Sequence, residues 1–181
     1  MAPRRAIPST HAWDDADLTT LSAPDQQHEI CDDRTNIQSH GLPLPTDFAY
    51  PYGAYEQNSV PAMVQQCGYS SAREVGGVQS DICPTGCPFA ETLPPANPFV
   101  TRTAPDMRID TTLAMVEGYV TQAEQHGGGW VQLVFHDMCS TDCTGDDYST
   151  TPAMLGQFLD WLQPRAANGT VTETVNQALG G

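Results

Sequence analysis

Residues 130–136 read Trp-Val-Gln-Leu-Val-Phe-His, the strongest strand candidate of the chain. A short run that is apolar on both faces is typical of a central strand in a parallel sheet. His136 ends the run, and the C-terminal ends of such strands carry the active sites of α/β folds. The sequence therefore predicts a parallel sheet with His136 at its functional edge. A strand-end histidine that only hydrogen-bonds a loop is an equally open interpretation.

Helices and strands alternate along the rest of the chain, which favours a parallel α/β sheet or barrel. Strands are expected at residues 47–50 and 70–75. Helices are expected from the cap Ser22 to Gly41, over Val60–Cys67, from the cap Asp110 to residues 127–129, and over Met154–Leu162.

The composition excludes several classes of function. Of 181 residues, 22 are Asp or Glu and seven are Lys or Arg, all seven of them Arg, so the formal net charge is −15. A nucleic-acid surface needs clustered Lys and Arg, and an anionic membrane attracts the same residues. We therefore expect no nucleic-acid partner. No segment approaches the run of about 18 apolar residues that spans a bilayer, so no membrane span is expected either. We also expect a monomer. Neutral carbohydrate is compatible with this charge.

The six cysteines point to an oxidising compartment. Four of them form two C-x3-C pairs in Gly-, Pro- and Thr-rich loops, and two lie in expected helices. Disulfides are favoured over a four-cysteine zinc site, although a structural zinc module stays open. The N-terminus has no apolar segment behind its arginines, so it is not a signal peptide. The disulfide candidates are Cys31, Cys67, Cys83, Cys87, Cys139 and Cys143.

Two further candidate sites depend on spacing. Residues 51–53 (Pro-Tyr-Gly) form a turn directly after an expected strand, at the same edge of the sheet as His136. His11 and Asp15 are four residues apart, which places two potential metal ligands on one side of the segment if it is helical. Solvated His and Asp at that spacing are also common.

Four stretches together resemble the polysaccharide deacetylase family, also called the NodB-homology domain or carbohydrate esterase family 4. Residues 48–55 (FAYPYGAY) resemble the Phe-Arg-x-Pro-Tyr-Gly motif, and residues 69–77 (YSSAREVGG) resemble the stretch after it. Residues 133–137 (LVFHD) resemble the closing Leu-x-x-His motif. Residues 10–18 (THAWDDADL) are similar to the zinc motif Ser/Gly-His-Thr-x-x-His-x-x-Leu.

The resemblance implies a distorted (β/α) barrel, incomplete at its N-terminal strands, that removes N- or O-acetyl groups from an extracellular carbohydrate polymer of the chitin, peptidoglycan or xylan type. Residues 1–17 have no periodicity and are expected to be irregular, and the resemblance implies a partial deacetylase domain at residues 18–181. A divalent metal, usually zinc, activates water in this family. By resemblance, His136 is the general acid, and Tyr52 supplies a backbone N–H to the oxyanion. Leu133 lines the acetyl pocket by the same resemblance, and His11 and Asp15 bind the metal. The remaining substrate-binding residues, which line the groove, are Tyr50, Pro51 and Gly53.

The chain also departs from the family pattern. Asp15 stands where the family has its second metal-binding histidine, and Ala49 stands where it has an arginine that orients the base. The family's Asp-Asp motif, which carries the base, belongs to an earlier strand that we expect to be absent here together with the export signal. The alternative function is therefore a catalytically inactive carbohydrate-binding remnant.

Overall fold

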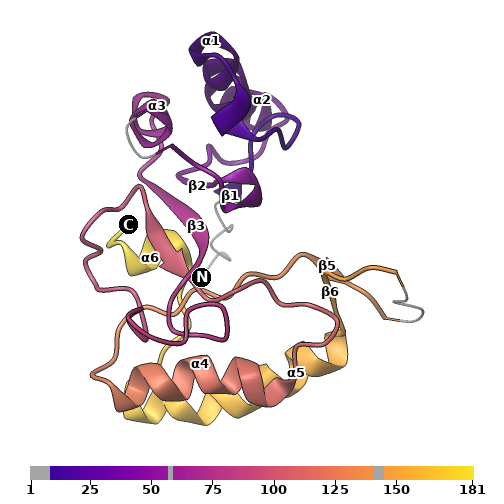
Figure 1. Ribbon diagram of the computed structural model, residues 1–181, viewed down its shortest axis with the longest axis vertical. Helices are drawn as coiled ribbons and strands as arrows, with labels where there is room; N and C mark the ends of the chain where they lie inside the picture. The colour runs from indigo at the N-terminus through magenta and orange to yellow at the C-terminus, as the bar shows by residue number, and fades with distance from the viewer. Residues whose placement is uncertain (1–8, 57–58, 141–144) are drawn as a thin grey trace. The chain divides into compact units, whose positions relative to one another are not determined.

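The structure, a computed structural model, describes residues 9–56, 59–140 and 145–181, which form two compact units (Figure 1). The first unit comprises Met1–Val75, Pro94–Thr101 and Thr174–Gly181, and the second comprises Gly76–Leu93 and Arg102–Glu173. No helix among the described residues is long and apolar enough to cross a membrane.

Helices of the first unit begin and end where the sequence predicts. After a short 3-10 turn at Leu18–Thr20, the Ser22 hydroxyl caps α1 (Ala23–Gln27) by accepting from the amide of Asp25. The helix continues through a π-helical stretch (His28–Asp32) into α2 (Asp33–Ser39). Gly41 follows with φ of 79°, a conformation that suits glycine at a helix end.

Four strands form one sheet in the order β1-β2-β3-β4. Their bounds are Ser9–Thr10, Asp47–Ala49, Ser71–Gly77 and Thr101–Thr103. β1 with β2 and β2 with β3 are parallel, and α3 (Val60–Gln66) connects the latter pair. This confirms the two predicted strands, the helix between them and their parallel arrangement. The fold is mixed α/β with parallel sheets, and the barrel stays a prediction.

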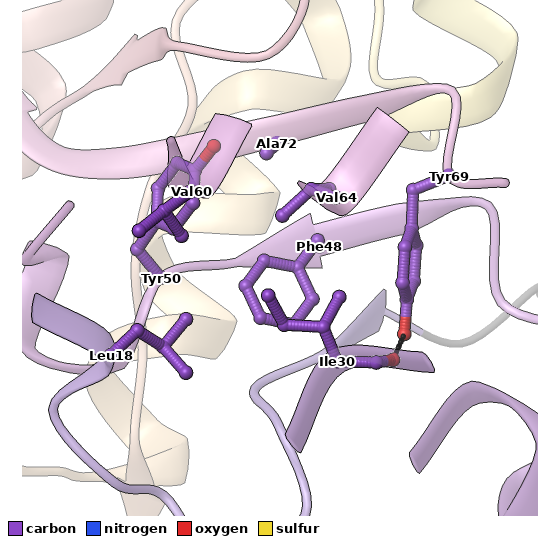
Figure 2. Close-up of a cluster of buried hydrophobic side chains, with 8 residues drawn as sticks. All are labelled: Leu18, Ile30, Phe48, Tyr50, Val60, Val64, Tyr69 and Ala72. Carbon is purple, nitrogen blue, oxygen red and sulfur yellow. Dashed lines mark hydrogen bonds between the residues drawn. The ribbon is translucent and has the colours of Figure 1, made fainter. Parts of the chain in front are cut away.

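One hydrophobic cluster fills the first unit (Figure 2). Phe48 lies at its centre, edge-on to the rings of Tyr50 and Tyr69 at centroid distances of 5.6 and 5.2 Å. The Tyr69 hydroxyl donates to the carbonyl of Ile30, which ties the ring to the π-helical stretch. The cluster comprises Leu18, Ile30, Phe48, Tyr50, Val60, Val64, Tyr69 and Ala72.

Disulfides staple both units. Cys31 bonds Cys67, joining the π-helical stretch to the end of α3, and Cys83 bonds Cys87 within a loop. Cys139 is also disulfide-bonded, and Cys143 lies outside the described residues. None of the described cysteines carries a free thiol, so the structure supports disulfides at the C-x3-C pair of residues 83 and 87 rather than zinc.

Helices α4 (Leu113–Gln125) and α5 (Pro152–Leu162) lie side by side in the second unit (Figure 1). The cap of α4 is Thr112, whose hydroxyl accepts from the amide of Met115, so the prediction of Asp110 as the cap is wrong by two residues. A short 3-10 helix (Gln163–Asn168) follows α5. Helix α6 (Val175–Ala178) belongs to the first unit. The second core comprises Val78, Ala104, Met107, Val116, Val120 and Phe158.

The expected strand at residues 130–135 is only partly formed. The amide of Ala104 donates to the carbonyl of Gln132, and the amide of Met107 donates to the carbonyl of Val134. The N···O distances are 2.8 and 2.9 Å. The two donors are three residues apart and the two acceptors only two, so one extra residue in the 104–107 segment interrupts a regular ladder and leaves isolated bridges. Beyond this run, β5 (Asp137–Met138) pairs in parallel with β6 (Ser149–Thr150).

The two described disulfides are expected to differ in their contribution to stability. They close chain segments of sequence separation 36 and 4. Replacing Cys31 and Cys67 by Ser should cost about 4 kcal/mol of unfolding free energy, against about 2 kcal/mol for the Cys83 and Cys87 pair, because the longer loop loses more closure entropy. Urea unfolding of both double variants measures this. Equal losses would contradict the loop-length argument.

Stability should depend on pH through Glu124 in α4. Its carboxylate accepts from the Thr170 hydroxyl at 2.7 Å and from the Arg165 guanidinium at 2.6 Å, and these bonds, the Thr170 bond first, lower the pKa of Glu124 below its usual 4.5. A lowered native pKa adds stability that is complete above the unfolded pKa and is lost as the pH falls through the native pKa. The Tm difference between wild type and Glu124→Gln should therefore shrink on acidification from about pH 6 to about pH 3. A difference independent of pH would overturn this.

Candidate active site

Three neighbouring chain segments of the second unit place His136. Asp106 forms a parallel bridge with Val134, which is buried and precedes the histidine by two residues. On the other side, Asp137 lies in register with Ser149 across the β5-β6 pair. The ends of these segments thus bring together side chains from residues 106–108, from His136 and from Tyr148.

His136 forms a pair with Asp106. The distance between Nε2 of His136 and Oδ1 of Asp106 is 2.9 Å. The two side chains are 36% and 17% exposed, so the imidazole remains accessible while the carboxylate is largely covered. A carboxylate at Nε2 holds the proton there and leaves Nδ1 for chemistry. This is the arrangement that a histidine acting as general acid or base requires.

Tyr148 and Arg108 complete the surroundings of the histidine. The tyrosine ring stands edge-on to the imidazole, with centroids 5.2 Å apart and an interplanar angle of 81°. The Arg108 guanidinium donates to the Tyr148 hydroxyl at 3.0 Å and its Cζ lies 4.3 Å from the centroid of the ring. His136 therefore contacts a carboxylate on one side and an aromatic ring on another.

The Pro-Tyr-Gly turn of the first unit is a 3-10 turn at Pro51–Gly53, directly after β2. Tyr52 is 73% exposed and has φ of 57°, a left-handed conformation that is costly for a residue with a side chain. Its backbone is held by hydrogen bonds from the amides of Gly53 to Tyr50 and of Ala54 to Pro51. Strain of this kind clusters at functional sites.

Tyr50 and Pro51 are both buried rather than presented at the surface. The Tyr50 hydroxyl donates to the carbonyl of Phe99 at 2.8 Å, and its ring stacks on Tyr55. Burial, with the charge of Glu74, raises the pKa of the Tyr50 phenol, so the group stays a neutral donor. In the structure these two residues support the turn from beneath.

His11 and Asp15 are brought together, with Nδ1 and Oδ1 3.3 Å apart. The spacing of four residues aligns these two side chains only in a helix, and residues 11–15 are not helical. It folds back through left-handed residues, Ala12 at φ 100° and Asp15 at φ 62°. The amides of Trp13 and Asp14 donate to the carbonyl and carboxylate of Glu29, which fixes the turn.

This pair alone does not fill a zinc site. Zinc in proteins takes three or four ligands of the His, Cys, Asp or Glu type. Across the residues that the structure describes, no group of three or more such side chains is placed to hold a metal ion. Imidazole and carboxylate suit zinc chemically, but the described donor set is incomplete.

Leu133 is half-buried and packs against the core of the second unit.

A surface pocket lined by residues 88–93 and 126–129 lies at the opposite end of the 130–136 run, beside Trp130. That pocket is therefore not part of the His136 site.

Sequence reasoning missed Asp106, Arg108 and Tyr148. A signal for Asp106 exists, because Thr-Arg-Thr-Ala at residues 101–104 precedes it as a short β-like run, and a carboxylate after such a run reaches the same sheet edge as His136. Tyr148 has no comparable signal, because it stands in an Asp- and Thr-rich loop.

The comparisons with known proteins agree with the resemblance in the first unit. The family model described as polysaccharide deacetylase matches residues 6–72. Residues 6–72 are thus similar to that family. The match covers the zinc-like stretch and the Pro-Tyr-Gly turn of that family, and it ends before His136. No curated protein and no solved structure matches the chain.

The Pro-Tyr-Gly turn gives a test of backbone strain. Gly53 has φ of 65°, and an added Cβ would lie 3.1 Å from the Cβ and the amide nitrogen of Val75. Gly53→Ala should cost about 2 kcal/mol or more of unfolding free energy, from the left-handed conformation together with the contact.

The matched control is Gly41→Ala, where φ is 79° and an added Cβ has open space. It should cost only the conformational part, about 1 kcal/mol. Chemical denaturation measures both variants. Equal losses would show that the approach to Val75 has no energetic effect.

Proposed function

We propose that this chain is an extracellular polysaccharide deacetylase, a hydrolase that removes N- or O-acetyl groups from a carbohydrate polymer. The observation that carries the proposal is the His136–Asp106 pair, with its open Nδ1, in a chain whose residues 6–72 match the deacetylase family. The disulfides are compatible with an extracellular protein. We propose that the protein acts as a monomer.

The proposed role of His136 is to protonate the leaving group. Hydrolysis adds water to the acetyl carbon, and the bond from that carbon to the sugar nitrogen or oxygen then breaks. The departing atom needs a proton, which the protonated imidazole can supply from Nδ1. Asp106 keeps the other ring nitrogen protonated and stabilises the positive charge of the imidazolium.

By the family resemblance, we propose that the backbone N–H of Tyr52 binds the developing oxyanion and that Leu133 contacts the acetyl group. His11 and Asp15 would hold the divalent metal, which in this chemistry polarises the acetyl carbonyl and acidifies water. Because they are two donors only, activity requires a base and further ligands from outside this pair.

The second candidate function is a carbohydrate-binding protein without catalysis. The incomplete donor set at His11 and Asp15, within the described residues, favours it. Such a protein would bind acetylated oligosaccharide without releasing acetate. Calorimetric binding and an acetate assay on the same sample distinguish the two functions.

The test of the catalytic proposal is acetate release from acetylated chito-oligosaccharide and acetylated xylan. His136→Ala should lower turnover by about 10²- to 10⁴-fold, because the leaving group loses its proton donor. The control is His126→Ala, an exposed histidine of the same unit at the end of α4, which should leave turnover unchanged. Near-wild-type turnover in His136→Ala would remove His136 from the mechanism.

A further inference from the structure

We propose that Tyr148, clamped by Arg108, is a positioning residue that fixes the orientation of the His136 imidazole. The expected effect on kcat rests on the proposed function, whereas the orientation of the His136 ring does not. It concerns residues outside the 6–72 family match.

The hydrogen bond to Asp106 holds the imidazole at one atom only. The χ2 torsion of histidine is broad, so a ring held at Nε2 can still rock, and Nδ1 moves with it. The Tyr148 ring comes from a different segment and packs nearly perpendicular to the imidazole, with ring centroids 5.2 Å apart. Two contacts from two directions define the ring orientation, whereas one does not.

Arg108 restrains the tyrosine in turn. Its guanidinium lies over the ring face and also donates to the hydroxyl, so that both the face and the tip of the ring are held. The tyrosine side chain is 42% exposed, and burial alone would leave it free to change rotamer. Arg108 therefore fixes the Tyr148 rotamer, which packing alone does not fix.

The backbone couples Tyr148 to both neighbours. Its carbonyl accepts from the amide of Asp137, the residue after His136, at 3.3 Å. The carbonyl of Asp147 accepts from Ile109, the residue after Arg108, at 3.1 Å. The segment that carries the ring is thus anchored beside the histidine and beside the arginine.

The consequence is a pre-oriented Nδ1. Displacement of a catalytic group by about 1 Å can cost about 100-fold in rate, since proton transfer needs close alignment. An imidazole held on two sides meets this requirement before substrate binds. Tyr148 itself donates no proton to the reaction in this scheme.

The experiment compares Tyr148→Phe, which keeps the ring, with Tyr148→Leu, which removes it, in the full chain. The first readout is the ¹⁵N NMR spectrum of the His136 imidazole at about pH 8, above the ordinary histidine pKa. We expect a single Nε2–H tautomer in wild type and Tyr148→Phe, and broadened or doubled signals in Tyr148→Leu. Tyr119→Leu, a half-buried tyrosine of α4, is the control and should leave these signals unchanged.

The second readout is kcat and KM for acetate release. Tyr148→Leu should lower kcat by about 10- to 100-fold with little change in KM, while Tyr148→Phe stays within about threefold of wild type. If Tyr148→Leu does not fold, Arg108→Met removes the clamp without touching the ring and should broaden the same imidazole signals.

A single sharp tautomer in Tyr148→Leu or in a folded Arg108→Met would overturn the proposal. So would a loss in Tyr148→Phe as large as in Tyr148→Leu, since the ring edge would then not be the active feature. If the wild type releases no acetate, the proposed function fails, and the NMR comparison still decides the positioning role.

Discussion

The register between β2 and β3 is the constraint on which the first unit depends. Phe48 lies opposite Ala72, a small partner, and its ring enters the core. Asp47 lies opposite Ser71, whose hydroxyl donates to the buried carboxylate at 2.7 Å. Side chains alternate across a strand, so a slip of one residue would turn Phe48 to the other face and lead Asp47 into the hydrophobic cluster. A three-residue strand can be specific because both of these penalties oppose the slip.

The same register places the Pro-Tyr-Gly turn. The amide of Tyr50 donates to the carbonyl of Arg73, one step beyond the last strand pair, and the chain then turns. The turn must reverse in three residues beside Val75, which only a glycine at position 53 allows without contact. The exposed Tyr52 is therefore a result of buried neighbours, namely Tyr50 below and β3 beside it.

Much of this fold could be predicted because its signals are local. Ser22 as a cap, the i, i+3, i+4, i+7 pattern from Val60 and the residues around Phe48 each depend on their own neighbours in the sequence. The strand at residues 130–135 was predicted from its own apolarity, but a ladder needs a partner, and one extra residue in the partner segment 104–107 interrupts it. Pairing is a property of two segments, and one segment does not reveal it.

The candidate site likewise contains residues with a local sequence signal and residues that only pairing between segments brings in. His136 could be found because it ends an apolar run, whereas Asp106 and Tyr148 join it only through pairing across 30 and 12 residues of sequence. His11 and Asp15 would share one side of the segment if it were helical, and in the structure they meet through a left-handed turn instead. Their role as metal ligands stays a prediction.

Charge placement explains why the histidine site is ordered in so acidic a chain. Asp106 and Arg108 are two residues apart in the sequence. Asp106 serves the imidazole and Arg108 serves the ring of Tyr148. Within the described residues Arg108 forms no ion pair, although the chain has 22 acidic residues. Because Arg108 contacts the ring of Tyr148 and does not pair with Asp106, the Asp106 carboxylate remains the hydrogen-bond partner of His136.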